Sequence, residues 1–244
     1  ANSSLVSANF DNTELYWSGY FKGATLTDAS FVSADFHEYA NFASADLDGA
    51  NFSGADLQSA DFSGASLIGA NLSNLSSGST SYTSIDFSNA QMMSADLSGS
   101  RFSSGTSFLS ADLTDAKFVS SVVYASMSNA QANGADFSNA SFSTGFSHAQ
   151  LNSANFDNAS FSQGSGSFYK AEISDASFVS ADFWMGASFR NATAERANFS
   201  GQDFQYANGD IDFSSADLDG ANFSGAHLES ADFSNASLID ADLT

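Results

Sequence analysis

Cysteine and proline are both absent from this chain of 244 residues. Without cysteine, the chain can form neither disulfide bonds nor a thiolate metal site. Long apolar runs are also missing, because no stretch approaches the roughly 18 residues that a membrane-spanning helix needs. These absences exclude a disulfide framework and predict a protein without a membrane partner.

Basic residues are scarce. Six Lys and Arg stand against 28 Asp and Glu, which gives a formal net charge of −22. Nucleic-acid phosphates and anionic lipids repel such a chain, so we expect no direct nucleic-acid binding. A cation or a basic protein surface would be attracted. High net charge can accompany disorder, but 43% of the residues are hydrophobic and 25 are Phe, which indicates a packed core.

The chain opens on Ala-Asn-Ser-Ser, without Met and without a positively charged apolar leader. A small polar start is typical of what remains after a signal peptide is removed, although a cloning remnant looks similar. We interpret the start as that of an extracytoplasmic or secreted protein, with a cytoplasmic protein as the alternative.

A five-residue word repeats through most of the sequence. Residues 50–74 read ANFSGADLQSADFSGASLIGANLSN: each word has Ala, then Asp, Asn or Ser, then Phe or Leu, then two small or polar residues. Internal repeats of this kind determine the architecture. We expect the central Phe or Leu of each word to form the core, at Phe42, Leu47, Phe52, Leu57, Phe62, Leu67, Leu72, Leu218, Phe223, Leu228, Phe233 and Leu238.

An odd repeat length requires a corner in every word. Extended backbone sends alternate side chains to opposite faces, so Ala and the centre, two residues apart, point the same way. The Asp or Asn between them points outward. A straight strand would change faces at every word and bury the acid in alternate ones. We therefore predict a turn at the last two positions, where Ser, Gly, Asn and Asp favour turns.

The places where the rhythm slips indicate the size of a coil. The breaks lie on average about 20 residues apart, which corresponds to four words and a square cross-section. About twelve such coils would stack ~4.8 Å apart. Insertions in solenoids gather on one edge, so residues 103–107 and 162–167 are expected to bulge from one region.

The iterated Ala-Asp/Asn-Leu/Phe word resembles the pentapeptide-repeat family. The resemblance implies an all-β, right-handed quadrilateral parallel β-helix, here a single solenoid domain over residues 1–244. In that family the inward Ala permits close packing and the central Phe or Leu fills the axis. This expectation agrees with the interpretation of the words themselves.

The two ends of the solenoid are expected to differ. Residues 11–25 depart from the word, and their aromatic residues Tyr16, Trp17, Tyr20 and Phe21 are predicted to cap the N-terminal coil. The C-terminal LIDADLT stops inside the rhythm. Because an open end exposes apolar side chains and unpaired backbone, we expect either a homo-oligomer through this end or a longer natural chain.

No sequence motif indicates catalysis. The signatures of serine hydrolases, zinc proteases, dinucleotide-binding folds and P-loops are missing. The three histidines, His37, His148 and His227, lie far apart in the sequence and are interpreted as surface residues. We therefore expect a non-enzymatic protein without a cofactor.

One stretch partly matches a calcium loop. Asn208, Asp210 and Asp212 are spaced like its first ligands, and Asp219 stands at the twelfth position. The required Gly is replaced by Phe213, however, and the last ligand should be Glu. Asp210, Asp212 and Asp219 are the metal candidates that the sequence offers, and a structural interpretation is favoured over a calcium site.

Outward acids are expected to form ladders. Residues 20 apart should stack on successive coils, as in Asp46, Ser66 and Asp86 on one side and Asp56, Ser76 and Asp96 on another. Neutral residues between acids would limit repulsion. Such a surface is consistent with solubility, with diffuse binding of divalent cations, or with display of charge to a basic partner.

Three functions are considered. The favoured one is a structural scaffold that binds a protein partner, basic or DNA-binding, through its acidic surface rich in Ser, Asn and Asp. The resemblance also suggests a DNA mimic acting on type II topoisomerases, of the quinolone-resistance type, although the apolar C-terminal dimerisation segment of that subgroup is missing. The third is an extracellular adhesion, ice-binding or mineral-binding surface, for which Thr is sparse.

Overall fold

The computed structural model describes residues 3–16, 21–37, 39–75, 84–161, 166–204 and 209–244. The chain forms two compact units, Ala1–Ser126 and Met127–Thr244, and each is described by itself. The single domain predicted over residues 1–244 stays a prediction. Within the described ranges there is no helix, and hence none that could cross a membrane. The all-β prediction is confirmed.

Unit 1 is a parallel β-solenoid with four sides. Its strands are β1 (Glu14–Leu15), β2 (Asp35–Phe36), β3 (Arg101–Phe102) and β4 (Val122–Val123), with β1 paired to β2 and β3 to β4. Single-residue bridges continue the pairing from coil to coil. One ladder runs through Ser4, Thr25, Asp46, Ser66, Gln91 and Asp112, a second through Asn9, Ser30, Asn51, Asn71, Asp96 and Lys117, and another through Asn41, Asp61, Asp86, Ser107 and Ser126.

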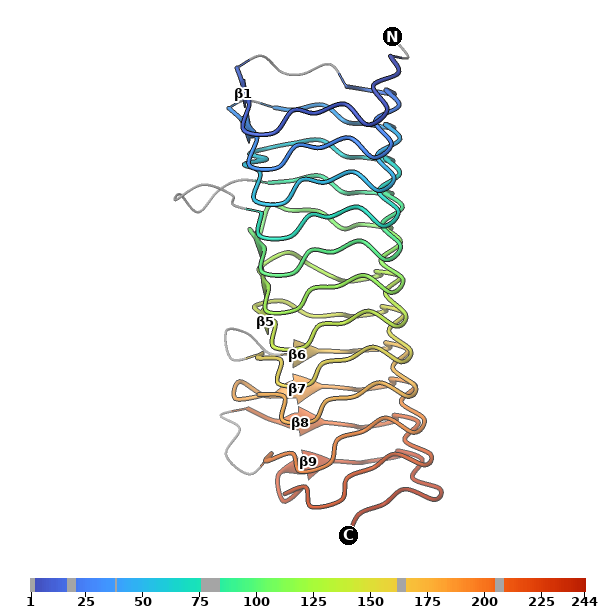
Figure 1. Ribbon diagram of the computed structural model, residues 1–244. Coiled ribbons are helices and arrows are strands. Elements are labelled where there is room, and N and C mark those ends of the chain that lie inside the picture. The colour runs from blue at the N-terminus through green and yellow to red at the C-terminus, as the bar shows by residue number, and fades with distance from the viewer. Residues whose placement is uncertain (1–2, 17–20, 38, 76–83, 162–165, 205–208) are drawn as a thin grey trace. The chain divides into compact units, whose positions relative to one another are not determined.

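Unit 2 is built in the same way. Its strands are β5 (Ser141–Phe142), β6 (Gly166–Ser167), β7 (Ala187–Ser188), β8 (Ile211–Asp212) and β9 (Ala231–Asp232). Strands β6 to β9 pair in parallel, one per successive coil (Figure 1). Other sides carry bridges, for example the ladder through Gln131, Gln150, Glu172, Thr193, Asp217 and Ser237.

The predicted number of coils differs slightly from the number of turns that the strands indicate. Counted by its two-residue strands, the solenoid has about nine turns, against the twelve predicted. Strands are not assigned on every coil, because the bridge ladders that begin at Ser4 and at Gln131 each pass through six coils. Described residues between Asn41 and Gly99 pair only through single-residue bridges, which do not make a strand. Strands are not assigned there because each side of a coil is short and a corner follows after only a few residues.

Most corners are tight turns, and an outward Asp or Asn caps many of them. Ala65 N donates to Phe62 O at 3.0 Å, and Gly64 between them has φ +63°. A positive φ at the third turn residue is the signature of a type II turn, and Asn, Asp and Ser adopt it here as well as Gly. Ser63 N donates to Oδ1 of Asp61 at 2.9 Å. The repeated outward Asp or Asn therefore has a structural role in closing its own corner.

The core consists of stacked Phe and Leu side chains above and below one another. In unit 2, Phe178 lies 5.0 Å from Phe156 and 4.9 Å from Phe199, with interplanar angles of 1° and 5°. Most of the predicted centres are at most 1% exposed: Phe42, Leu47, Phe52, Leu57, Phe62, Leu67, Leu72, Leu218 and Phe223. The other three, on the last coil of unit 2, are half-buried: Leu228, Phe233 and Leu238.

The N-terminal segment is more regular than predicted. In the described part of residues 11–25, β1 pairs with β2 and Thr25 bridges to Asp46, so the segment follows the coil. Tyr16 is 59% exposed and stacks on His37 at 4.4 Å rather than covering the core. Phe21 is half-buried and stacks on Phe42 at 5.0 Å. Trp17 and Tyr20 lie outside the described residues.

Two further expectations need correction. Residues 103–107 add a single residue to their word and close in a tight turn, in which Thr106 N donates to Ser103 O at 3.0 Å and Thr106, 5% exposed, takes the inward position of Ala. The expected partner of Ser66, Asp86, bridges instead to Asp61, and Ser66 bridges to Gln91, because five additional residues precede Asp86 in that coil. For the same reason, Asp96 bridges to Asn71 and is not the ladder partner of Ser76. Residues 162–165 and Ser76 lie outside the described part.

Two buried serines in unit 1 give a matched test of hydrogen bonding in the core. Ser100 and Ser121 both take the inward position of Ala and are at most 1% exposed. The Ser100 hydroxyl donates to Leu72 O at 2.8 Å and accepts from Leu75 N at 2.9 Å, whereas the Ser121 hydroxyl has no partner among the described residues.

We expect Ser100→Ala to lower the free energy of unfolding by about 1–3 kcal/mol, because it leaves two buried backbone groups without their partner. Ser121→Ala is expected to be neutral or to stabilise by up to about 1 kcal/mol, because it removes an unpaired hydroxyl. Urea denaturation measures both. Equal destabilisation by the two variants would contradict the assignment.

Candidate functional site

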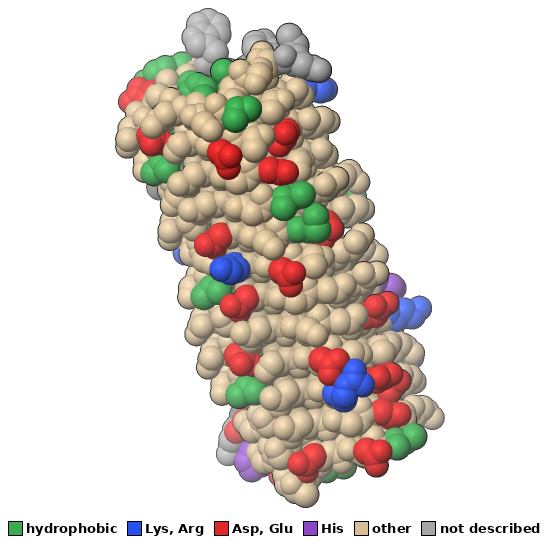
Figure 2. Space-filling model, turned by 45° about the vertical axis from the view of Figure 1, so that its right-hand side comes forward, with side chains coloured by type: hydrophobic (Ala, Val, Ile, Leu, Met, Phe, Trp, Pro, Cys, Tyr) green, Lys and Arg blue, Asp and Glu red, His purple; other side chains and the backbone are tan. Residues whose placement is uncertain are grey.

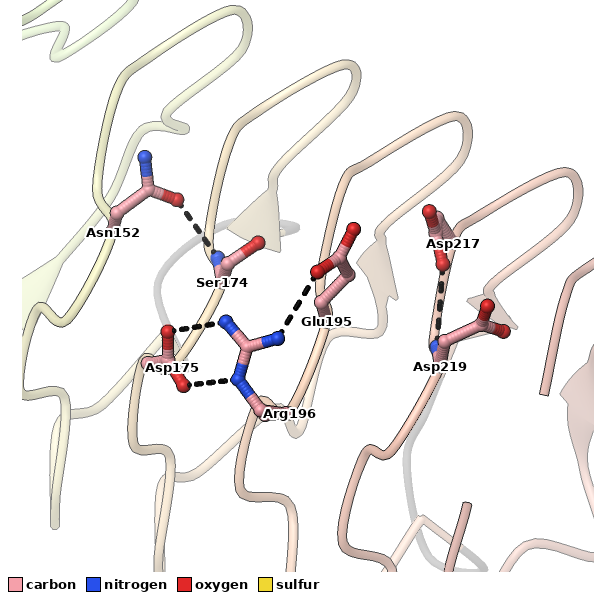
Figure 3. Close-up of polar contacts among 7 residues, drawn as sticks. All are labelled: Asn152, Ser174, Asp175, Glu195, Arg196, Asp217 and Asp219. Carbon is pink, nitrogen blue, oxygen red and sulfur yellow. Dashed lines mark hydrogen bonds and ion pairs between the residues drawn. The ribbon is translucent and has the colours of Figure 1, made fainter. Parts of the chain in front are cut away.

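One corner of unit 2 carries polar contacts over several successive coils (Figure 3). We call it the polar corner, defined as Asn152, Ser174, Asp175, Glu195, Arg196, Asp217 and Asp219. Asn152 Oδ1 accepts a hydrogen bond from Ser174 N at 3.0 Å, one coil further on. Asp219 N donates to Asp217 Oδ1 at 3.2 Å within its own corner. Side chains here are held by the backbone of their own or the next coil.

A single guanidinium neutralises part of this corner. Arg196 donates from Nε and Nη2 to the two oxygens of Asp175, both at 2.7 Å, and from Nη1 to Glu195 at 3.1 Å (Figure 3). Hydrogen bonding from Arg196 lowers the pKa of Asp175, and Asp175 in turn raises the pKa of Arg196. Because all three side chains are about half exposed, solvent screens the pair and its effect on stability is small.

Some corner aspartates clamp one coil to the next. Asp157 Oδ1 accepts from Ser177 Oγ at 2.5 Å and from Val179 N at 3.0 Å. Asp219 Oδ1 accepts from Ser237 Oγ at 2.5 Å and from Ile239 N at 2.9 Å. Asp11 and Asp48 make the equivalent contacts in unit 1.

The clamps explain a pattern that the sequence analysis missed. In each clamp the next coil has Ser as its outward residue, followed two positions later by Val or Ile. These outward Ser side chains leave the N–H of their own corner to the aspartate of the preceding coil. The detectable signal is Asp at the first corner position and Ser-x-Val/Ile about one coil later.

The acidic residues are unevenly distributed along the chain. Residues 171–244 contain 13 Asp and Glu but only two basic residues, Arg190 and Arg196, so this stretch carries eleven of the 22 net negative charges. On the face shown in Figure 2, carboxylate side chains outnumber those of Lys and Arg and are spread over much of the surface. A surface of this kind attracts cationic groups.

The structure does not bring the metal candidates together. Asp210 and Asp212 line a groove beside β8, whereas Asp219 is engaged in its clamp at the polar corner. Asn208 lies outside the described residues. In the ranges that are described, no group of three or more His, Asp or Glu side chains is arranged to hold a metal ion.

The histidines have separate surroundings. His37 lies 3.4 Å from Asp35 and stacks on Tyr16, His148 contacts the edge of Tyr169, and His227 lies 3.8 Å from Glu229. None of these neighbours supplies a nucleophile with a general base. The surroundings of the three histidines therefore give no support for an acid–base or nucleophilic role of these side chains.

Asp56 is the outward acid with the least favourable surroundings. Its ladder neighbour is Asp35, its Oδ1 is buried without a hydrogen-bond partner among the described residues, and its Oδ2 accepts from Gln58 at 3.3 Å. Burial raises the pKa of Asp56, and the hydrogen bond from Gln58 acts in the opposite direction. A raised pKa means that ionisation of this carboxyl opposes folding at neutral pH.

Comparison with known proteins identifies the repeat. Two family models described as pentapeptide repeats match, one in eight copies over residues 39–74, 185–208 and 210–244 and the other in nine copies over residues 10–56. Together they span about half of the chain. No functionally curated protein matches the sequence.

Solved structures of the same repeat are similar to this chain. HetL, a protein involved in heterocyst differentiation regulation from the cyanobacterium Nostoc sp. strain PCC 7120, is 22% identical over 99% of this chain and 87% of its own, with a TM-score of 0.40. A thylakoid-lumen protein from Arabidopsis thaliana is 30% identical over 47% of this chain and 64% of its own, with a TM-score of 0.24.

Full-length QnrB1, a plasmid-mediated fluoroquinolone resistance protein, is 18% identical over 97% of this chain and 92% of its own, with a TM-score of 0.29. These likenesses concern the repeat and carry no argument about function. The five-residue words, the four-sided parallel coils and the two family models agree, and the chain belongs to the pentapeptide-repeat family.

Proposed function

We propose that this protein is a non-enzymatic scaffold that binds a basic surface of a protein partner. The observation that supports the proposal most strongly is the concentration of net negative charge in residues 171–244, on coils held by stacked Phe side chains and capped corners. A surface that is already ordered loses little conformational entropy on binding. The partner proposed is a protein with exposed Lys or Arg side chains.

The arrangement of the acids supports binding in preference to catalysis. Most outward carboxylates accept hydrogen bonds from their own corner or from the next coil, so they are held in place as acceptors. The described residues contain no group of ionisable side chains that could hold a metal. Charge complementarity gives specificity and a fast association rate, and both depend on salt concentration.

Carbodiimide cross-linking in an extract of the source organism tests this function, because it joins carboxylates directly to lysines in contact with them. We expect one recurring protein partner, joined mainly through carboxylates of residues 171–244 and lost at high salt. A set of variants with Asp→Asn changes confined to residues 1–126 serves as the control and should still be joined to that partner. Cross-links distributed evenly over both units, or none at all, would contradict the proposal.

A further inference from the structure

One corner of unit 2 carries two large apolar residues in succession. Trp184 and Met185 follow the buried centre Phe183. Other words of unit 2 have at most one large apolar residue at these two positions, such as Val179 or Ile239, whereas here both are large and apolar. They are 51% and 42% exposed, so two large apolar side chains lie next to each other at the surface. Asp182 Oδ1 accepts a hydrogen bond from Trp184 N at 3.0 Å, which holds this corner in place.

Each of the two side chains borders a groove. Trp184 lines the smaller one, of about 280 Å³, together with Asp182, Gln202 and Asp203. Met185 lines the larger one, of about 730 Å³, over strands β7 to β9. The Trp184–Met185 pair therefore forms an apolar ridge shared between two hollows of the same unit. Neither core packing nor corner closure requires such side chains at this place.

Close backbone approach supports the floor of the larger groove. Gly186 has φ +84°, and a Cβ built there would lie 2.7 Å from Asp210 O and 2.9 Å from Gly209 C. Only Gly allows the two coils to come so near at this point. Asp210 is consequently held beside Met185.

The walls of both grooves are acidic. Their described lining residues include six carboxylates and no Lys or Arg: Asp182, Asp203, Asp210, Asp212, Glu229 and Asp232. Hydrogen bonds from Ser234 lower the pKa of Asp232, and Arg190 acts on it in the same direction from outside the lining. These grooves therefore offer an aromatic face with negative charge on both sides.

We propose that the Trp184–Met185 ridge and its two grooves bind a basic peptide segment of the partner, with an Arg or Lys side chain over Trp184. Trp is the aromatic residue that attracts cations most strongly, and the carboxylates on both sides would pair with neighbouring basic residues. The apolar ridge would contact the aliphatic stems of those side chains. This inference rests on the proposed scaffold function and assigns it a site and a class of ligand.

Fluorescence of Trp184 tests the site directly. The chain has two Trp residues, so a Trp17→Phe background leaves Trp184 as the sole reporter. The probe is a short blocked peptide of alternating Gly and Arg, and its control is the same peptide with neutral citrulline in place of Arg. We expect the Arg peptide to change the Trp184 emission at low salt. The affinity of the citrulline peptide should be lower by about tenfold or more.

Matched variants separate the ridge from general attraction to an acidic protein. Calorimetry with Trp184→Leu should show an affinity for the Arg peptide about tenfold lower. The double change Asp210→Asn and Asp212→Asn should weaken binding further, while Asn at 212 keeps the acceptor for Ser214 N. Leu109→Ala, at a similarly exposed apolar residue of unit 1, and the double change Asp112→Asn and Asp115→Asn should have little effect.

Several outcomes would overturn the inference. One is equal weakening by the unit 1 and unit 2 acidic pairs, which would indicate diffuse attraction. Another is an unchanged affinity of Trp184→Leu. A third is a change in Trp184 emission with neutral maltohexaose but not with the Arg peptide, which would indicate a sugar site. In each case, a partner cross-linked to other carboxylates of residues 171–244 would leave the scaffold function standing, whereas the absence of any cross-linked partner would remove that function itself.

Discussion

Phe178→Ala is expected to lower the free energy of unfolding by about 3–5 kcal/mol. The side chain is fully buried and stacks face to face on Phe156 and Phe199 in the adjacent coils. It also contacts the ring of Phe168 edge-on at 5.3 Å. Because hydrogen-bonded corners hold the coils at their spacing, the cavity can collapse only partly, and most of the lost contact remains lost. Urea denaturation followed by circular dichroism measures the effect.

Phe233→Ala is the control for this prediction. The Phe233 side chain is half-buried and stacks on one ring, Phe213, at 5.1 Å. We expect a cost of about half that of Phe178→Ala, because less apolar surface is returned to water. Equal costs for the two variants would mean that stacking on both sides adds nothing in this core.

Gly186→Ala is expected to lower the free energy of unfolding by about 2–4 kcal/mol. Two costs combine at this residue: a positive φ that an L side chain adopts poorly, and a Cβ too close to the backbone of residues 209 and 210. The coils would have to move apart to admit the methyl group. Thermal and urea denaturation should both show the loss. The Trp184 emission should also change, because Gly186 N closes the corner that carries Trp184 by donating to Phe183 O at 2.8 Å.

Gly201→Ala separates these two costs. Gly201 has φ +67°, and a Cβ there would meet nothing within 4 Å. It should therefore show only the backbone term, about 1 kcal/mol. If Gly186→Ala were no more harmful than Gly201→Ala, the two coils would not be in close contact at residue 186.

Much of the fold follows from the five-residue word. Ala and the centre share an inward face and the odd repeat forces a corner, so the all-β solenoid and its four sides could be predicted from residues such as Ala60 and Phe62. The turn count and the ladder partners could not, because each insertion shifts the register. The additional residues before Asp86 moved it from the expected ladder to that of Asp61. The pairing geometry also decides which sides of the coils form strands and which form only single-residue bridges.

The candidate site was less predictable. Trp184 and Met185 are visible as exceptions to the word, but the sequence does not show that two grooves adjoin them. At Gly186 the backbone of one coil approaches residues 209 and 210 of the next. This approach depends on one residue, so it leaves no periodic pattern in the sequence. The clamps, in contrast, have a local signature, Asp followed one coil later by Ser-x-Val/Ile. It was missed because the sequence analysis treated the outward acids only as surface charge.

The inter-coil clamps have a consequence for chemical ageing. Aspartate and asparagine before glycine are prone to form succinimides, a reaction in which the glycine nitrogen attacks the side-chain carbonyl. In Asp48-Gly49 and Asp219-Gly220 the glycine N–H donates to the next coil, at 2.9 and 2.7 Å, while the carboxylate is held by a hydroxyl and a backbone N–H. Both reacting groups are thereby kept from each other, so the folded protein should resist isomerisation at these two Asp-Gly sequences.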